Sequence, residues 1–511
     1  MSNAVLKPHV PAAGYALFLV IFATQTWGGV FPFLPADFQT DTVTLLFYLS
    51  QSLAFCGAFV ASAFGSYFFP LAARHMLVKL STALTFLGAA CVIAAMYAPA
   101  WTQALVLGGG AFLGVGCAGL FMLWQRYFSS LEAQACNSRL IAGTILASAA
   151  YFALYLIPIA LTAFLLPVVV LPVCALCLSL AVRQMDFNQP MFEDVPRQNP
   201  QVYAKLLQDS WREALCVGAL AFAAGLARGV AVLNPAISGV VNASSMLGML
   251  AAAVILLLLW MRASVRFSLQ SVFRMAYPAI ITGLLLFPFV KNVGLGLFVS
   301  LTYGLFSLVV LIMMMQCAQI ARERGTNPVF AYAFFGSMAY VPQSIGFLLG
   351  WFAFDIEILG VGQVTLLSLV AAYVLGMALF VSSRARSRAD QVVLTSMAFR
   401  HKAKGTDGQT SPVSAGPKDK KPSRKKKEFA EGRVIADRLS KQCLALQERY
   451  GLSERETEVA ELIARGRTVA AIAQELFVSE NTVRTHSKHI YTKLNIHSKA
   501  ELSALVQSMN V

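Results

Sequence analysis

Charged side chains are scarce in this 511-residue sequence. Asp, Glu, Lys and Arg make up 13% of the residues, hydrophobic residues make up 57%, and the mean hydropathy is +0.65. An average soluble domain is about 25% charged. The composition therefore excludes an ordinary water-soluble protein and indicates a membrane protein.

Carboxylates are absent from the long apolar runs that fill most of the chain. Each run is long enough to cross a bilayer as a helix, which takes about 20 residues. The sequence therefore predicts an all-α, polytopic bundle of transmembrane helices. The twelve runs are 14–34, 43–68, 77–98, 101–124, 140–157, 160–182, 214–232, 237–261, 275–290, 294–319, 329–354 and 359–381.

The missing carboxylates also bear on activity. A proton-coupled transporter commonly uses an Asp or Glu inside the membrane, so active transport is disfavoured, while facilitated movement stays open.

Seven of the nine cysteines lie in the apolar runs, where they serve best as small packing residues. A redox role for Cys174 and Cys177 is disfavoured, because no second pair or His lies near them in the sequence. No nucleophile–base or metal constellation is present, so we expect no enzyme, cofactor or metal site.

Basic residues are concentrated in alternate loops. If the N-terminus is inside, the inner loops carry most of the Lys and Arg, and the outer loops carry little beyond Lys291 with a few carboxylates. No cleavable signal peptide is visible. The positive-inside rule then predicts a multi-pass protein of the inner (cytoplasmic) membrane, with both termini in the cytoplasm.

Arg228 is the one charged residue clearly inside a predicted span. Our hypothesis is that it faces a central cavity and binds an anionic or phenolic group of a small molecule. The alternatives are that it extends to the outer headgroups or pairs with a backbone carbonyl. Further candidates for the cavity are Gln25, Trp27, Gln51 and Tyr340, and after them Tyr48, Tyr303, Gln316 and Gln343. Most of these residues are expected instead to make ordinary interhelical hydrogen bonds or to anchor the membrane interface.

Six spans, a longer loop at 183–213 and six more spans resemble the major facilitator superfamily in architecture. This resemblance implies two six-helix halves. The signature loop of the family is not kept, because Gly65 is followed by Phe69, Pro70 and Ala72 at the signature positions, and only Arg74 matches.

A helix-turn-helix pattern lies near the end of the chain. In a helix over 479–490, Val483 and Ile490 fall on the inner face. Before it, Val469, Ile472, Ala473 and Leu476 mark a shorter helix, and Ser453 with Glu456 forms a capping box. The outer face of the 479–490 helix carries Asn481, Arg484, Thr485 and Lys488.

Residues 451–502 resemble the DNA-binding domain of LuxR-type transcription regulators nearly position for position. The resemblance implies four helices, of which the third lies in the major groove and the fourth, about 499–508, often pairs two subunits. It places Arg484, Thr485 and Lys488 at base-reading and nearby phosphate positions, and Thr482 at a backbone contact. Taken alone, such a face is usually only solvated. The complete set expected to bind DNA is Ser479, Asn481, Thr482, Arg484, Thr485 and Lys488.

Three segments follow from these patterns: a membrane sensor over 1–381, a basic and disordered linker over 382–429, and a reader over 430–511. The linker charge is attracted both to anionic lipids and to DNA phosphates. Ahead of the reader, Ile435, Leu439, Cys443 and Leu446 form an apolar stripe, which either covers the reader or pairs two chains.

The sequence therefore predicts a membrane-embedded one-component transcriptional regulator that senses a small molecule and binds promoter DNA. Its expected partners are double-stranded DNA, the lipid bilayer, an unknown small-molecule ligand, a second copy through the fourth helix of the reader, and RNA polymerase if it activates. One alternative is a major-facilitator-type transporter with a fused DNA-binding feedback domain. Another is proteolytic release of the reader.

Overall fold

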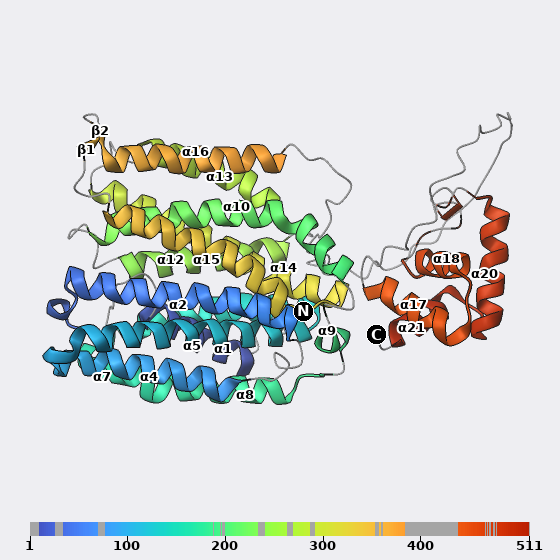
Figure 1. Ribbon diagram of the computed structural model, residues 1–511, viewed down its shortest axis with the longest axis horizontal. Helices are drawn as coiled ribbons and strands as arrows, with labels where there is room; N and C mark the ends of the chain where they lie inside the picture. The colour runs from blue at the N-terminus through green and yellow to red at the C-terminus, as the bar shows by residue number, and fades with distance from the viewer. Residues whose placement is uncertain are drawn as a thin grey trace.

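The computed structural model consists almost entirely of helices, in a long bundle and a small domain beside one of its ends (Figure 1). We call these parts the bundle and the reader. The residues that the structure describes are 10–25, 34–69, 77–187, 189–194, 196, 200–233, 241–262, 269–286, 292–352, 357–358, 361–383, 438–465, 467, 469, 472–473, 476 and 478–509.

The bundle follows the predicted twelve runs. The first half contains α1 (Val10–Gln25), α2 (Asp41–Phe68), α4 (Val78–Tyr97), α5 (Thr102–Ser130), α6 (Ala133–Leu154), and α7 (Ile159–Leu165) joined to α8 (Leu171–Arg183) by the π-helical turn Leu166–Val170. The second half contains α10 (Pro200–Val232), α12 (Val241–Arg262), α13 (Leu269–Leu286), α14 (Asn292–Arg324), α15 (Pro328–Phe352) and α16 (Gln363–Ser383). Within the described ranges each run coincides with one helical segment, so the predicted bundle is confirmed.

Short elements connect these helices. They are the 3-10 turns Ala36–Phe38 and Pro99–Trp101, the short helix α9 (Pro190–Glu193) between the halves, and an antiparallel pair of two-residue strands, β1 (Glu357–Ile358) and β2 (Val361–Gly362).

The outside of the bundle is apolar. In the described part of the chain, seven helical segments are long and apolar enough to cross a bilayer, and large apolar side chains such as Leu53 and Leu156 are 77% and 87% exposed. Soluble monomers rarely expose an apolar surface of this extent. The chain is therefore a multi-pass membrane protein.

Glycines bring helices close together within each half. A Cβ atom added to Gly225 of α10 would lie 2.0 Å from the backbone oxygen of Gln343 on α15, and one added to Gly114 of α5 would lie 2.5 Å from that of Gln51 on α2. Small residues permit such backbone contact in membrane helices. These contacts bring α10 against α15 beside Gln343, and α5 against α2 beside Gln51.

The reader contains α17 (Arg438–Tyr450), α18 (Glu454–Ala464), α20 (Glu480–Leu494) and α21 (Lys499–Ser508). Its core is built from apolar faces spaced at helical intervals, and Ile472 and Ala473, between α18 and α20, are buried in the same core. Cys443 and Leu446 of α17 are fully buried there, which confirms that the predicted stripe packs on the reader. Ile435 and most of the predicted linker lie outside the described residues.

Candidate functional sites: an exposed helix of the reader and a cavity in the bundle

Local capping and packing fix the position of α20. Ser479 is its N-cap, and the Ser479 hydroxyl accepts a hydrogen bond from the Thr482 backbone N–H at 3.1 Å. Val483 and Ile490 are fully buried, as predicted. Asn495 ends the helix in the left-handed region, at φ 52°, which Asn tolerates better than most residues. The opposite face of α20 is therefore held outward.

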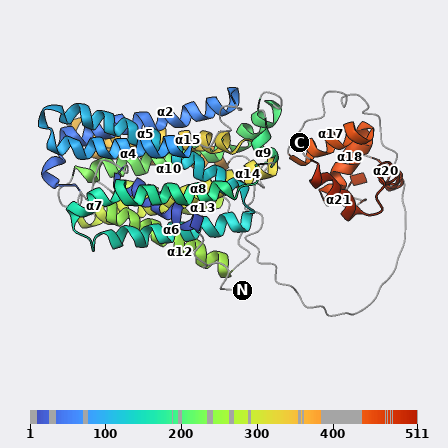
Figure 2. The ribbon, with the colours of Figure 1, turned by 90° about the horizontal axis from the view of Figure 1, so that it is seen from below.

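The outward face carries the predicted DNA-binding side chains. Asn481, Arg484, Thr485 and Lys488 are all exposed. The Thr485 hydroxyl donates to the backbone oxygen of Asn481 at 2.9 Å, and Arg484 forms a 3.4 Å pair with Glu480, one turn earlier. In both views α20 lies on the side of the reader away from the bundle (Figures 1 and 2). The four side chains are thus exposed on a helix that lies on the outer side of the reader.

A buried carboxylate ties α18 to the C-terminal part of α20. Glu456 accepts hydrogen bonds from the Lys493 ammonium and from the Ser453 backbone N–H, both at 2.8 Å, and completes the predicted capping box. Burial by itself would raise the pKa of Glu456. The contacts with Lys493 and Ser453 outweigh that effect and lower the pKa to about 2. The carboxylate is therefore ionised at neutral pH and stabilises the reader.

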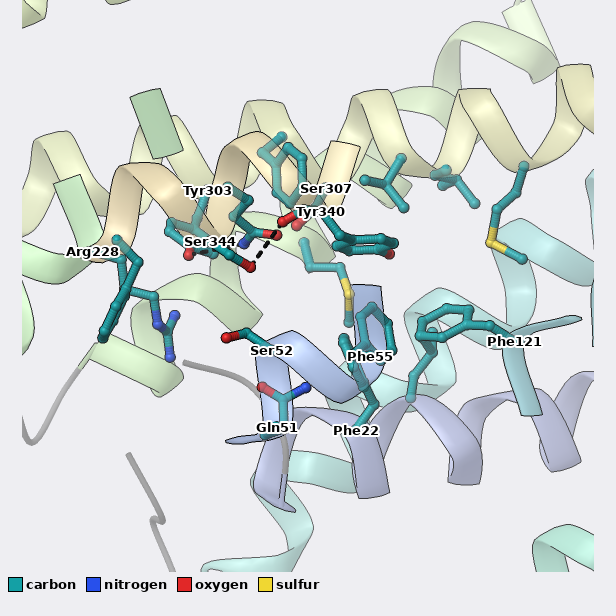
Figure 3. Close-up of a pocket in the computed structure, with 18 of the residues that line it drawn as sticks. Phe22, Gln51, Ser52, Phe55, Phe121, Arg228, Tyr303, Ser307, Tyr340 and Ser344 are labelled. Carbon is teal, nitrogen blue, oxygen red and sulfur yellow. Dashed lines mark hydrogen bonds between the residues drawn. The ribbon is translucent and has the colours of Figure 1, made fainter. Parts of the chain in front are cut away.

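The bundle contains a cavity between its two halves (Figure 3). Its volume is about 100 Å³, counted as the space that the centre of a water-sized molecule can occupy, and part of the cavity is open to solvent. Arg228 lies toward one end of the group in Figure 3 and Phe121 toward the other. The wall is mostly aromatic and apolar, with polar groups interspersed. Its aromatic residues are Tyr15, Phe22, Tyr48, Phe55, Phe121, Tyr303, Phe306, Tyr340 and Phe347, and its uncharged polar residues are Gln51, Ser52, Thr144, Ser307, Gln343 and Ser344.

Arg228 is fully buried and lines the cavity. Its guanidinium donates hydrogen bonds to the Ser245 hydroxyl at 3.2 Å and to the side-chain oxygen of Asn242, and it lies 4.9 Å from the centre of the Tyr303 ring. Extension to the headgroups is therefore contradicted, because a side chain that reaches them would be exposed. Ser245, Asn242 and the Tyr303 ring thus hold the guanidinium at the cavity wall.

The other predicted cavity residues fall into different places. Gln51 and Tyr340 line the cavity with Arg228. Gln25 lines a separate, smaller pocket with Leu113 and Ala163, because it lies on a face of α1 turned into the first half. The prediction that it lines the cavity with Arg228 is therefore wrong. Gln316 is buried but does not line the cavity, and Trp27 lies outside the described residues.

Sequence reasoning missed two groups around this cavity. Asn242 and Ser245 hold Arg228, and the only available signal was their polarity within an apolar run. Phe22, Phe55 and Phe121 gave no signal, since an aromatic residue in a transmembrane run can equally face lipid. In the part of the chain that the structure describes, no cluster of three or more His, Cys, Asp or Glu side chains could hold a metal ion.

Comparison with known proteins separates the two parts of the chain. Residues 451–506 match the family described as bacterial regulatory proteins, luxR family. Over 51 residues the chain is 55% identical to the oxygen regulatory protein NreC of Staphylococcus epidermidis and 53% identical to a putative transcriptional regulator of Pseudomonas aeruginosa. The match covers 10% of this chain and only 23% and 25% of those proteins, so the likeness is confined to the reader.

The bundle is similar to solved transporter structures in fold alone. A bacterial homologue of the iron transporter ferroportin, in an outward-facing state, aligns with a TM-score of 0.51 at 12% identity. The alignment covers 74% of this chain and 100% of that one. FucP, a Major Facilitator Superfamily transporter, aligns with a TM-score of 0.48 at 13% identity, over 74% of this chain and 98% of that one.

Proposed function

Because residues 451–506 are a LuxR-type helix-turn-helix domain and the helices before them share the fold of a membrane transporter, we propose that the chain is a membrane-embedded one-component transcriptional regulator. The reader binds promoter DNA through α20, and the bundle senses a small molecule in its cavity. The observation that carries this proposal is that an exposed reading face and a cavity wall holding a buried cation occur on one chain.

The cavity wall indicates the chemistry of the ligand. Arg228 supplies a fixed positive charge, for which an anionic or phenolic group is the natural partner. Tyr340, Phe55 and Phe121 offer ring faces and edges to an apolar or aromatic body. A small organic molecule with both features fits this wall, and Gln51 can donate to or accept from its polar end.

We further propose that the protein lies in the inner membrane with both termini in the cytoplasm, where the reader can reach DNA. Two readers would pair on an operator through α21. Leu502 and Val506 of α21 are buried within the reader itself, so the pairing surface would be the opposite side, which exposes Glu501, Ala504 and Ser508. If the protein activates transcription, RNA polymerase is the remaining partner.

A transporter with a feedback domain is the second candidate, since the bundle fold is that of a transporter. Uptake into sealed vesicles separates the two functions. A sensor binds a radiolabelled aromatic acid or phenol at up to one molecule per chain, whereas a transporter accumulates or equilibrates it inside.

The proposed function is tested in cells that carry a reporter promoter and the full-length chain, exposed to a panel of aromatic acids and phenols. We expect a reporter response to at least one compound. The substitution Arg228→Glu should abolish the response while DNA binding by the purified protein stays unchanged. A chain lacking residues 1–381 that still gives the same compound-dependent transcription would refute sensing by the bundle.

A further inference from the structure

An ion pair joins the reader to the bundle. The Lys441 ammonium of α17 lies 2.7 Å from the Asp194 carboxylate, which follows α9 in the segment between the two halves. Both side chains are nearly buried, with exposed fractions of 7% and 3%. Exposed ion pairs contribute little, but a pair withdrawn from water to this degree is costly to break, because the remaining charge would stay buried. The pair therefore indicates a specific contact between the reader and the bundle.

Lys441 is rigidly part of the reader. On either side of it, the Ser440 hydroxyl donates to Glu461 of α18 at 2.7 Å, and the Gln442 side chain donates to the backbone oxygen of Met509 at 3.1 Å. The buried Cys443 follows directly. Because α17 is held in the reader core, the position of Lys441 reports the position of the whole reader.

Asp194 is held equally firmly by the bundle. Its second carboxylate oxygen accepts a hydrogen bond of 2.5 Å from the Tyr203 hydroxyl of α10. The same hydroxyl accepts a 2.8 Å hydrogen bond from the backbone N–H of Asn327, between α14 and α15. The contact thus runs from Lys441 through Asp194 and Tyr203 to Asn327, and α17 also contacts α14.

Tyr203 also belongs to the seam between the two halves. Its ring lies 5.9 Å from that of Tyr67 on α2 in the first half, and 4.9 Å from that of Phe330 on α15 in the second. Beside it, Arg322 of α14 donates to the backbone oxygen of Ser130 on α5 at 3.5 Å. The end of the bundle nearest the reader is therefore closed by contacts between the halves.

We propose that Asp194 and Tyr203 form a docking site for α17 of the reader, complete only while the two halves are closed at this end. Separation of the halves moves Tyr203 away from Tyr67, disturbs the hydrogen bond that orients Asp194, and releases Lys441. The ligand as the cause of this separation rests on the proposed function, whereas the docking contact does not. Since α20 lies on the far side of the reader, docking restricts its orientation without covering it (Figure 1).

The test measures docking in the full-length protein in lipid nanodiscs, without ligand or DNA. Spin labels are attached through non-natural amino acids at the exposed positions Glu132 and Glu448, so that the native cysteines stay in place. We expect a single, narrow distribution of label-to-label distances in the protein that carries no other substitution. The substitution Lys441→Glu should lower the ratio of docked to undocked molecules at least about tenfold. Arg449→Glu is the matched control, because Arg449 is an exposed cation of the same helix that stacks on Tyr450 of the reader itself.

Two further variants sharpen the outcome. Combining Asp194→Lys with Lys441→Asp should restore part of the narrow distance, which a merely unfolded reader could not do. Tyr67→Ala, which opens the seam without touching Asp194, should also broaden the distance. An unchanged distance in Lys441→Glu would overturn the docking site, and an unchanged distance in Tyr67→Ala would overturn its dependence on the seam. DNA binding measured on the same samples tests the proposed function separately.

Discussion

Replacement of Arg484 by Ala tests whether α20 reads bases. Arg484 is 66% exposed on the outer face of the helix, and its pair with Glu480, at 3.4 Å, is also exposed to solvent. Such a pair one turn apart contributes about 0.3–0.5 kcal/mol at most. Because Ala favours helix at least as well as Arg, the free energy of unfolding of the reader should change by less than about 0.5 kcal/mol.

The expected loss in DNA binding is much larger. A side chain that makes a good base contact discriminates by about 1–3 kcal/mol, which corresponds to a loss of affinity of about 5-fold to 150-fold. On duplexes without the operator sequence, only the loss of one positive charge should remain. The two effects differ enough to be resolved in one titration.

The assay uses the full-length protein in nanodiscs and two fluorescent duplexes, an operator selected from a random pool and its scrambled version, at fixed salt. Arg455→Ala is the matched control, because Arg455 forms a similar exposed pair with Glu458 on α18, away from α20. Equal losses on both duplexes would show that Arg484 contacts phosphate only. No loss on either would refute the assignment of α20 as the reading helix.

Three further predictions concern single residues. Lys488→Ala should lower the affinity for both duplexes equally and reduce the slope of log affinity against log salt concentration by about 0.9. An unchanged slope would exclude a contact between Lys488 and phosphate. Arg228→Gln should abolish the reporter response to the active compound with operator affinity intact, and a retained response would remove Arg228 from the ligand site. The pKa of Glu456 is lowered to about 2 from 4.5, so its stabilisation is full above about pH 4.5 and is lost as the pH falls toward 2, a loss on the order of 3 kcal/mol. Amide hydrogen exchange in α20, corrected for intrinsic rates, should reveal that loss of stability. Glu456→Gln should remove the pH dependence of the stability, and the same pH dependence in the variant would show that another group causes it.

Most of the reader could be predicted from sequence, because its determinants are local. The capping box of Ser453 and Glu456 and the buried faces of Val483 and Ile490 follow from spacing along one helix. The bundle helices could be placed for a similar reason, since apolar length alone separates a span from a loop.

The cavity and the docking contact depend on tertiary geometry that sequence patterns do not contain. Gln25 and Gln51 are both glutamines in apolar runs, yet only Gln51 faces the cavity, because the rotation of each helix is set by its neighbours. Asp194 and Lys441 are 247 residues apart. From the sequence alone, Asp194 would be predicted to be an exposed charge of a loop, and Lys441 an exposed charge of a helix. Contacts between residues far apart in the sequence therefore determine which side chains form the cavity and the docking contact.

The cavity and the docking site are bordered by the same two helices. Tyr340 of α15 lines the cavity and packs on Phe59 of α2, with ring centres 5.3 Å apart, while Tyr67 and Phe330 of the same helices meet at the seam, 6.0 Å apart. Between them, a Cβ atom added to Gly336 of α15 would lie 2.3 Å from the fully buried Phe59 ring.

Gly336→Ala should therefore force α15 away from α2 and loosen the seam without any ligand. Because α2 and α15 are continuous helices, a shift at Gly336 should reach Phe330, fewer than two turns away, and displace it from Tyr67. The measurement is the same label distance between positions 132 and 448, which we expect to broaden as it does in Tyr67→Ala. Gly376→Ala on α16, where an added Cβ meets nothing within 4 Å, is the matched control. A distance that stays narrow in Gly336→Ala, in protein that is folded and binds DNA normally, would mean that movement of α15 against α2 is not what connects the cavity to the reader.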